Sequence, residues 1–283
     1  MADVGPVLMD GAMGTLLWQL AQEAGVERKP VWTYNIDHPD LVRQAHRCYL
    51  EAGSELILAN TFGANRLAVM RGEMQVSDVI RTGMRLAGET AGAYGARAAL
   101  DLGPLTELLE PYGDLEAETC AGLYREMVDT GLEAGADCVV LETFMDLEML
   151  RIAAEQALGR GVPVLCAMTF EAGGRTLMGN TVEQVAEALE PMGVAAVGVN
   201  CSLGPAQALP LLRRLRTCTR LPLLFKPNAG LPSALPGGLG ESCTAEQFAC
   251  EMAPALELAQ YVGGCCGCDE AFIRALKEKL DRP

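Results

Sequence analysis

Histidine is nearly absent from this sequence, which holds only His38 and His46, both in or near one predicted helix. A histidine-rich metal site is therefore not expected, and zinc would have to be bound by some of the eleven cysteines. Aromatic residues make up 5% of the chain, and the formal net charge is -15. A nucleic-acid surface needs a basic face and usually stacking rings, so the composition argues against nucleic-acid binding. The acidic charge also argues against binding to anionic membranes.

Long apolar runs are lacking as well, since the longest, such as residues 138–141 and 162–165, are far too short to span a bilayer. The first residues show no basic segment followed by an apolar one, so we expect no secretory signal and a cytoplasmic protein. Thiols stay free in a reducing compartment. Inside helices and strands cysteine behaves as a small apolar residue. We therefore expect only packing or surface roles for Cys48, Cys120, Cys138, Cys166, Cys218 and Cys250.

Short β-type runs alternate with longer helical patterns along the whole chain, half of which is apolar. Strands are predicted at 7–9, 55–60, 97–101, 138–142, 162–169, 195–200, 221–225 and 260–262. Helices are predicted at 14–23, 40–52, 76–94, 115–133, 147–158, 182–189, 206–217, 245–258 and 270–280. Eight β/α units predict an α/β fold of the (β/α)8 TIM-barrel type, formed as one domain by residues 1–283. A doubly wound sheet is the alternative, but residues 10–15 have fewer glycines than its phosphate-binding loop requires.

Polar side chains and thiols gather where the predicted strands end. In a parallel barrel the active site lies at the carboxyl ends of the strands, so these residues would share one mouth. The first, second, fourth and seventh strands are followed by polar groups, and the sixth and eighth by cysteines. In chain order these residues are Asp10, Gly11, Asn60, Thr61, Glu142, Thr143, Asn200, Cys201, Asn228, Cys265 and Cys266.

The three thiols predict a zinc site. Cys201 follows the sixth strand, and the adjacent Cys265 and Cys266 follow the eighth, only two strands away around a closed barrel. Three thiolates would leave the fourth position of a zinc ion free for water or a substrate thiol. The spacing alone leaves two alternatives open, packed thiols or a strained vicinal disulfide, because it is not a Cys-x-x-Cys pattern. Cys268 would be a competing ligand.

The carboxylates predict an amino-acid site beside the thiols. Asp10 and Glu142 would hold an ammonium group, while backbone amides near Gly11 and the hydroxyl of Thr61 would meet a carboxylate. Two alternatives remain: Asp10 only caps the helix starting near residue 14, and Glu142 only satisfies loop amides.

Six motifs in this order resemble those of one known family. They are residues 10–15 (DGAMGT), 60–64 (NTFGA), 142–144 (ETF), 200–205 (NCSLGP), 227–230 (PNAG) and 263–267 (GGCCG). The chain is similar to the homocysteine S-methyltransferases from residue 7 to about 280. Among these it most resembles the homocysteine-binding barrel of the cobalamin-dependent methionine synthases.

The resemblance implies that Cys201, Cys265 and Cys266 hold a catalytic zinc, with the sulfur of homocysteine as fourth ligand. It also implies that Asp10, Gly11, Thr61 and Glu142 bind the amino acid, and we hypothesise that the Asn228 oxygen ligates zinc before substrate arrives. Two departures are notable. Lys226 stands where an acidic residue is frequent, and Cys268 where threonine is common. We expect neither to touch the proposed ligands.

The methyl donor is not fixed by these motifs. The resemblance implies betaine, S-methylmethionine or methylcobalamin, and betaine ranks last because residues 62–67 offer one aromatic for cation–π contact. We expect transfer to L-homocysteine, giving L-methionine, from methylcobalamin on a separate corrinoid protein, since no cobalamin module follows residue 280. S-methylmethionine is the alternative donor. A non-catalytic zinc-dependent thiol sensor is the alternative function.

Overall fold

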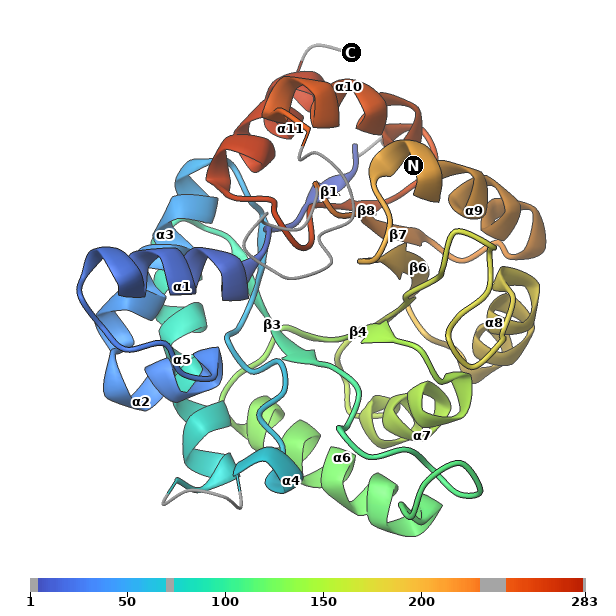
Figure 1. Ribbon diagram of the computed structural model, residues 1–283, viewed down its shortest axis with the longest axis horizontal. Coiled ribbons are helices and arrows are strands. Elements are labelled where there is room, and N and C mark those ends of the chain that lie inside the picture. The colour runs from blue at the N-terminus through green and yellow to red at the C-terminus, as the bar shows by residue number, and fades with distance from the viewer. Residues whose placement is uncertain (1–4, 70–73, 230–242, 282–283) are drawn as a thin grey trace.

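The computed structural model describes residues 5–69, 74–229 and 243–281. Its eight parallel strands form one sheet in the order β1-β8-β7-β6-β5-β4-β3-β2. The strands surround the centre of Figure 1 and the helices form an outer ring. The strands are β1 (Val7–Leu8), β2 (Leu56–Leu58), β3 (Arg97–Leu102), β4 (Cys138–Phe144), β5 (Val164–Met168), β6 (Ala196–Asn200), β7 (Leu223–Lys226) and β8 (Tyr261–Val262). The predicted (β/α)8 TIM barrel is confirmed.

The barrel closes between β1 and β2, which are joined by an isolated bridge and single hydrogen bonds in place of a continuous ladder. Met9 forms an isolated parallel bridge with Leu56, and the Glu55 amide donates to the carbonyl of Leu8 at 2.8 Å. One step further along, the amide of Leu58 donates to Oδ2 of Asp10 at 2.7 Å. A side-chain carboxylate therefore replaces a backbone carbonyl at the closing seam.

The helices agree with the predicted ranges to within two residues at each end. They are α1 (Met13–Glu23), α3 (Pro39–Glu51), α5 (Val76–Ala93), α6 (Ala117–Glu133), α7 (Leu147–Ala157), α8 (Val182–Leu189), α9 (Pro205–Cys218), α10 (Ala245–Leu256) and α11 (Glu270–Asp281). The sequence did not predict α2 (Tyr34–Asp37), α4 (Arg66–Val69) or the 3-10 helices η1 (Val31–Thr33) and η2 (Glu190–Met192). Such elements are too short to show a helical periodicity.

Side chains on alternate strand positions divide the core into two parts. The barrel interior is filled by Met9, Leu56, Leu58, Ala99, Cys138, Val140, Leu165, Ala167, Ala196 and Leu224. Their neighbours along each strand point outward and pack against the helices. Cys120, Cys138 and Cys166 are buried, Cys48 is partly buried, and Cys218 and Cys250 are exposed, so these cysteines are packing and surface residues as expected. Among the described helices, none is both long enough and apolar enough to span a bilayer.

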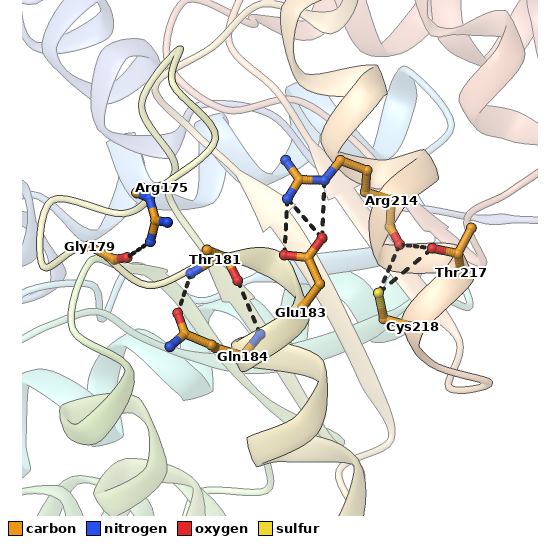
Figure 2. Close-up of polar contacts among 8 residues, drawn as sticks. All are labelled: Arg175, Gly179, Thr181, Glu183, Gln184, Arg214, Thr217 and Cys218. Atoms are coloured by element: carbon orange, nitrogen blue, oxygen red, sulfur yellow. Dashed lines mark hydrogen bonds and ion pairs between the residues drawn. The ribbon is translucent and has the colours of Figure 1, made fainter.

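Side chains fix the start of α8 and join it to α9. The hydroxyl of Thr181 accepts from the amide of Gln184, whose side chain accepts from the amide of Thr181, and this is a capping box. Figure 2 shows this pair beside Arg214 of α9, whose guanidinium forms a bidentate ion pair with Glu183. The ion pair thus joins the helices of two successive β/α units on the outside of the barrel.

Candidate metal centre and acceptor site

The structure brings the three predicted thiols together. The Sγ atoms of Cys201, Cys265 and Cys266 all lie within 4.8 Å of one another, and those of Cys201 and Cys266 are 3.8 Å apart. Tetrahedral zinc with Zn–S bonds of about 2.3 Å requires S–S separations of about 3.8 Å. In the described part of the chain this is the one group of cysteine, histidine and acidic side chains that could hold a metal. The residues therefore fit a three-thiolate zinc site.

The loop after β6 adopts an unusual backbone to present its thiol. Cys201 and Ser202 have φ values of 59° and 56°, in the left-handed region that residues other than glycine rarely adopt. The Cys201 amide donates to the carbonyl of Lys226 at 3.0 Å, which ties the loop to the end of β7. Strain of this kind persists only where surrounding contacts enforce it, and it is common at functional sites.

The glycines before the cysteine pair serve close packing. A Cβ at position 263 would lie 2.7 Å from the carbonyl oxygen of Asp10, and one at position 264 would overlap the Cβ of Cys268. The absence of side chains at these two positions thus lets the backbone after β8 pack closely against Asp10 at the end of β1 and against Cys268. After the pair, Gly267 has a φ of 83°, in the left-handed region.

Hydrogen bonds among the thiols concentrate negative charge on one sulfur. The thiols of Cys265 and Cys266 donate to Cys201 and lower its pKa to about 3, with help from the Ser202 amide and Asn228 and against the effect of burial. The same bonds to Cys201 raise the pKa of Cys265 well above its usual value and that of Cys266 to about 12. The lowered pKa of Cys201 favours a thiolate at this position, and a thiolate is the form that binds a metal ion.

A buried cluster of charges lies beside the thiols. The ammonium of Lys226, at the end of β7, is 3.3 Å from Oδ1 of Asp10 and 3.3 Å from Oε2 of Glu142. Burial alone would lower the pKa of Lys226, but the two carboxylates outweigh it and raise the pKa above its usual value. Burial raises the pKa of Asp10 to about 6, against the opposing effect of Lys226. At neutral pH Lys226 is therefore a cation, and Asp10 is ionised.

The contacts of Lys226 correct one expectation. The lysine was expected to leave the proposed ligands untouched, yet it pairs with both predicted acceptor-binding carboxylates, and its carbonyl bonds the amide of Cys201. Cys268, the other departure, is buried with its Sγ 3.8 Å from the carbonyl of Pro227, and it does not belong to the thiol group.

The other predicted acceptor residues differ in how open they are. Asp10 is fully buried and both its oxygens are bonded, whereas 9% of the Glu142 side chain is exposed. The hydroxyl of Thr61 donates to the carbonyl of Asp101 at 2.7 Å and accepts from its amide. Gly11 lies against Cys268 and Tyr49, where a Cβ would overlap the Cys268 carbonyl. Asn228 is buried, and its Oδ1 has no hydrogen-bond partner within the described residues.

The alternative roles for the two carboxylates are not those seen. Ala12 is the N-cap of α1 and no side chain caps that helix, so Asp10 does not cap it. The carboxylate of Glu142 pairs with Lys226. All eleven cysteines are free, so Cys265 and Cys266 form no vicinal disulfide. Gly230, the last residue of the fifth motif, lies outside the described residues.

Two further features shape the site: the pairing of Asn200 with Thr143, both expected at strand ends, and Asp101, which was not predicted. Asn200 accepts from the amide of Thr143 and donates to its hydroxyl, both at 2.8 Å, which locks the end of β4 to the end of β6. Asp101 on β3 is buried, its Oδ1 has no partner among residues 5–69, 74–229 and 243–281, and burial raises its pKa well above the usual range. The available signal was the place of these residues at strand ends, but their pairing required the barrel geometry.

Comparisons with known proteins agree with this site. The family described as homocysteine S-methyltransferase matches residues 7–280. Methionine synthase of Mycobacterium leprae is 34% identical over 298 residues, which cover 96% of this chain and 24% of that protein. Methionine synthase of Mycobacterium tuberculosis is 34% identical over 293 residues, with 94% and 24% covered. The chain thus spans about a quarter of the length of these relatives.

A solved structure supports the fold. The homocysteine methyltransferase MmuM from Escherichia coli, in its metallated form, superposes with a TM-score of 0.82 at 24% identity, covering 98% of this chain and 96% of that one. At this identity the likeness concerns the fold alone, whereas the family match extends over nearly the whole sequence. The chain therefore belongs to the homocysteine S-methyltransferase family.

Proposed function

We propose that this protein transfers a methyl group to the thiol of L-homocysteine, giving L-methionine, with zinc held by Cys201, Cys265 and Cys266. The observation that carries the proposal is the convergence of these three thiols at the strand ends of a barrel of this family. The bond between the methyl carbon and the acceptor sulfur forms as the bond to the donor breaks, and the thiol proton leaves to solvent.

The chain's own residues prepare the acceptor. Three thiolates around a dication give a net charge of -1, so the centre stays electron-rich. When bound, zinc would lower the pKa of the acceptor thiol from its free value of about 8.5 and hold its sulfur for attack on carbon. The left-handed backbone at Cys201 and the packed glycines before Cys265 fix the three sulfurs in advance. Pre-organisation of this kind avoids an ordering cost when the acceptor binds.

The amino-acid end of the acceptor is proposed to lie near Asp10, Gly11, Thr61 and Glu142. Glu142 supports this most directly because its buried side chain keeps a small exposed surface, whereas Asp10 has none, and its carboxylate is held by Lys226. Asn228 is proposed to lend its unpaired Oδ1 to zinc while no acceptor is bound. If substrate-free Asn228→Ala shows the same zinc coordination as the wild type by X-ray absorption spectroscopy, this role of Asn228 is wrong.

The donor is proposed to be methylcobalamin carried by a separate corrinoid protein. This donor follows from the resemblance of the strand-end motifs to the cobalamin-dependent methionine synthases, and the named relatives at 34% identity are methionine synthases. We also propose that residues 1–283 form one domain and, from the eleven free cysteines, that it works in the reducing cytoplasm. S-methylmethionine remains the second candidate donor, because the strand-end motifs do not fix the source of the methyl group.

Metal analysis combined with a donor panel tests this function. Wild-type protein should hold one zinc and form methionine from L-homocysteine, while Cys201→Ser should lose both properties. Cys218→Ser, which changes an exposed cysteine at the C-terminal end of α9, is the matched control and should keep both. The panel contains a methyl-corrinoid protein, free methylcobalamin, S-methylmethionine and betaine.

Each departure from this pattern has a defined meaning. Zinc retained by Cys201→Ser would overturn the metal site. Methionine formed from S-methylmethionine but from no methylcobalamin carrier would overturn the donor ranking. Binding of homocysteine to the zinc form without turnover from any donor would favour a thiol sensor instead.

A further inference from the structure

Lys226 occupies a position normally suited to a ligand's ammonium. Its side chain is 1% exposed, and its Nζ lies 3.3 Å from one oxygen of Asp10 and 3.3 Å from one oxygen of Glu142. These two carboxylates lie far apart in the sequence, because Asp10 follows β1 and Glu142 lies near the end of β4. They face the same point beside the thiol cluster, and that point is filled by the protein's own cation.

The ion pairs leave little binding capacity on the first carboxylate. Oδ2 of Asp10 accepts from the amide of Leu58 at 2.7 Å, Oδ1 accepts from Lys226, and the residue is fully buried. Glu142 is the only one of the two with exposed side-chain surface, and one of its oxygens is already bonded to Lys226. A ligand's ammonium can therefore reach Glu142 but cannot lie between the two carboxylates.

The charge of Lys226 also acts on a bound ligand. A ligand's ammonium that binds Glu142 would lie close to a second positive charge, because the ammonium of Lys226 already contacts the same carboxylate. A nearby like charge disfavours a charged group, and the effect is large in a site removed from water. A ligand that carries a carboxylate but no ammonium meets no such repulsion and is attracted by the lysine.

We propose that Lys226 is a specificity-determining residue that takes the place of the acceptor's α-ammonium, so that the site binds acceptor thiols with a carboxylate whether or not they carry an amino group. The inference rests on the proposed binding of acceptor thiols at the zinc centre. It concerns which thiols are selected and is independent of the methyl donor.

Calorimetric titration of the zinc-loaded protein with two thiols tests this role. L-homocysteine and 4-mercaptobutanoate have the same carbon chain and differ only in the amino group. In the wild type the two should bind with affinities within about tenfold of each other. In Lys226→Met the preference for homocysteine should rise at least about tenfold, the lower end of what a neighbouring unit charge does to a charged group. If Lys226 had a purely structural role, Lys226→Met would weaken the binding of both thiols equally.

Two companion variants keep the test decisive. Removing Lys226 alone leaves two buried carboxylates unpaired, which can prevent folding. Lys226→Met combined with Asp10→Asn removes one charge of each sign, keeps an acceptor for the Leu58 amide, and should show the same rise in preference. Lys277→Met, which removes an exposed lysine paired with Asp281 on α11, should leave the preference unchanged.

The results separate this inference from the proposed reaction. An unchanged preference in both Lys226 variants, or a wild-type preference for homocysteine above about a hundredfold, would overturn the role of Lys226 even if methionine is formed. A rise in preference without methyl transfer from any donor would support the role of Lys226 and overturn the reaction. Failure of both thiols to bind the zinc-loaded wild type would overturn both.

Discussion

His46 is a buried titratable residue whose ring is surrounded by apolar packing. It lies on the inner face of α3, is fully buried, and neither ring nitrogen has a hydrogen-bond partner within the described residues. Burial lowers its pKa from 6.5 to about 3. The folded protein therefore holds the neutral imidazole, whereas the unfolded chain takes up a proton below pH 6.5.

This difference makes stability depend on pH in a defined direction. Because the folded pKa is lowered, the contribution is fully present above pH 6.5 and is lost as the pH falls toward 3. At pH 5 the wild type should have lost about 2 kcal/mol of unfolding free energy through this residue, relative to pH 8. In His46→Leu that part of the loss should disappear in urea unfolding curves. His38→Gln, which keeps His46, should retain the loss, and equal pH slopes for all three proteins would refute the assignment.

Gly264 offers a second test at the level of one residue. A Cβ there would overlap Cys268 just before the cysteine pair, so Gly264→Ala should destabilise the fold by about 1–3 kcal/mol and weaken zinc binding. Cys268→Gly in the same chain removes the opposing Cβ and should recover part of the zinc affinity. Normal zinc affinity in Gly264→Ala would show that the loop can relax without cost.

The capping box of α8 gives a prediction for a whole element. Thr181→Ala removes the hydroxyl that accepts from the amide of Gln184, and loss of such a cap costs about 1 kcal/mol. The free energy of unfolding in urea should fall by this amount. Thr217→Ala on α9 is the control, because the Thr217 hydroxyl bonds the Arg214 carbonyl and the Cys218 sulfur, both within its own helix. It should change stability by less than about 0.5 kcal/mol. Equal effects of the two substitutions would contradict the capping role.

Most elements could be predicted from the sequence because each has its own local pattern. The strands read as apolar runs covered on both faces, and the nine long helices show a helical periodicity. Cys201 and the pair at 265–266 could be placed together because strand ends of a barrel share one side. The Lys226 cluster could not be predicted, since Asp10, Glu142 and Lys226 meet only when three inward-facing side chains from β1, β4 and β7 reach the same height inside the barrel. The link from Asn200 to Thr143 depends in the same way on strand register.

For the molecule as a whole, bound zinc should stabilise the fold, because it would join Cys201 after β6 to the cysteine pair after β8. A ligand that binds only the folded state stabilises it by about 3 kcal/mol when present at 100 times its dissociation constant. A chelator should therefore lower the melting temperature of the wild type measured by calorimetry, and added zinc should restore it. Cys201→Ser should melt at one temperature with or without chelator. A chelator effect of the same size in that variant would place the stabilising metal elsewhere.

The position of β8 in the sheet has a consequence for how the protein acquires its metal. Cys201 and Cys266 are 65 residues apart, and β8 must insert between β7 and β1 before the cysteine pair can face Cys201. While the chain is still being synthesised, Cys201 is the only one of the three thiols that follows a completed strand, because Cys265 and Cys266 come after β8. We therefore expect the complete three-thiolate site to form only after β8 has inserted, so that zinc bound by all three thiols marks a barrel in which β7, β8 and β1 are paired.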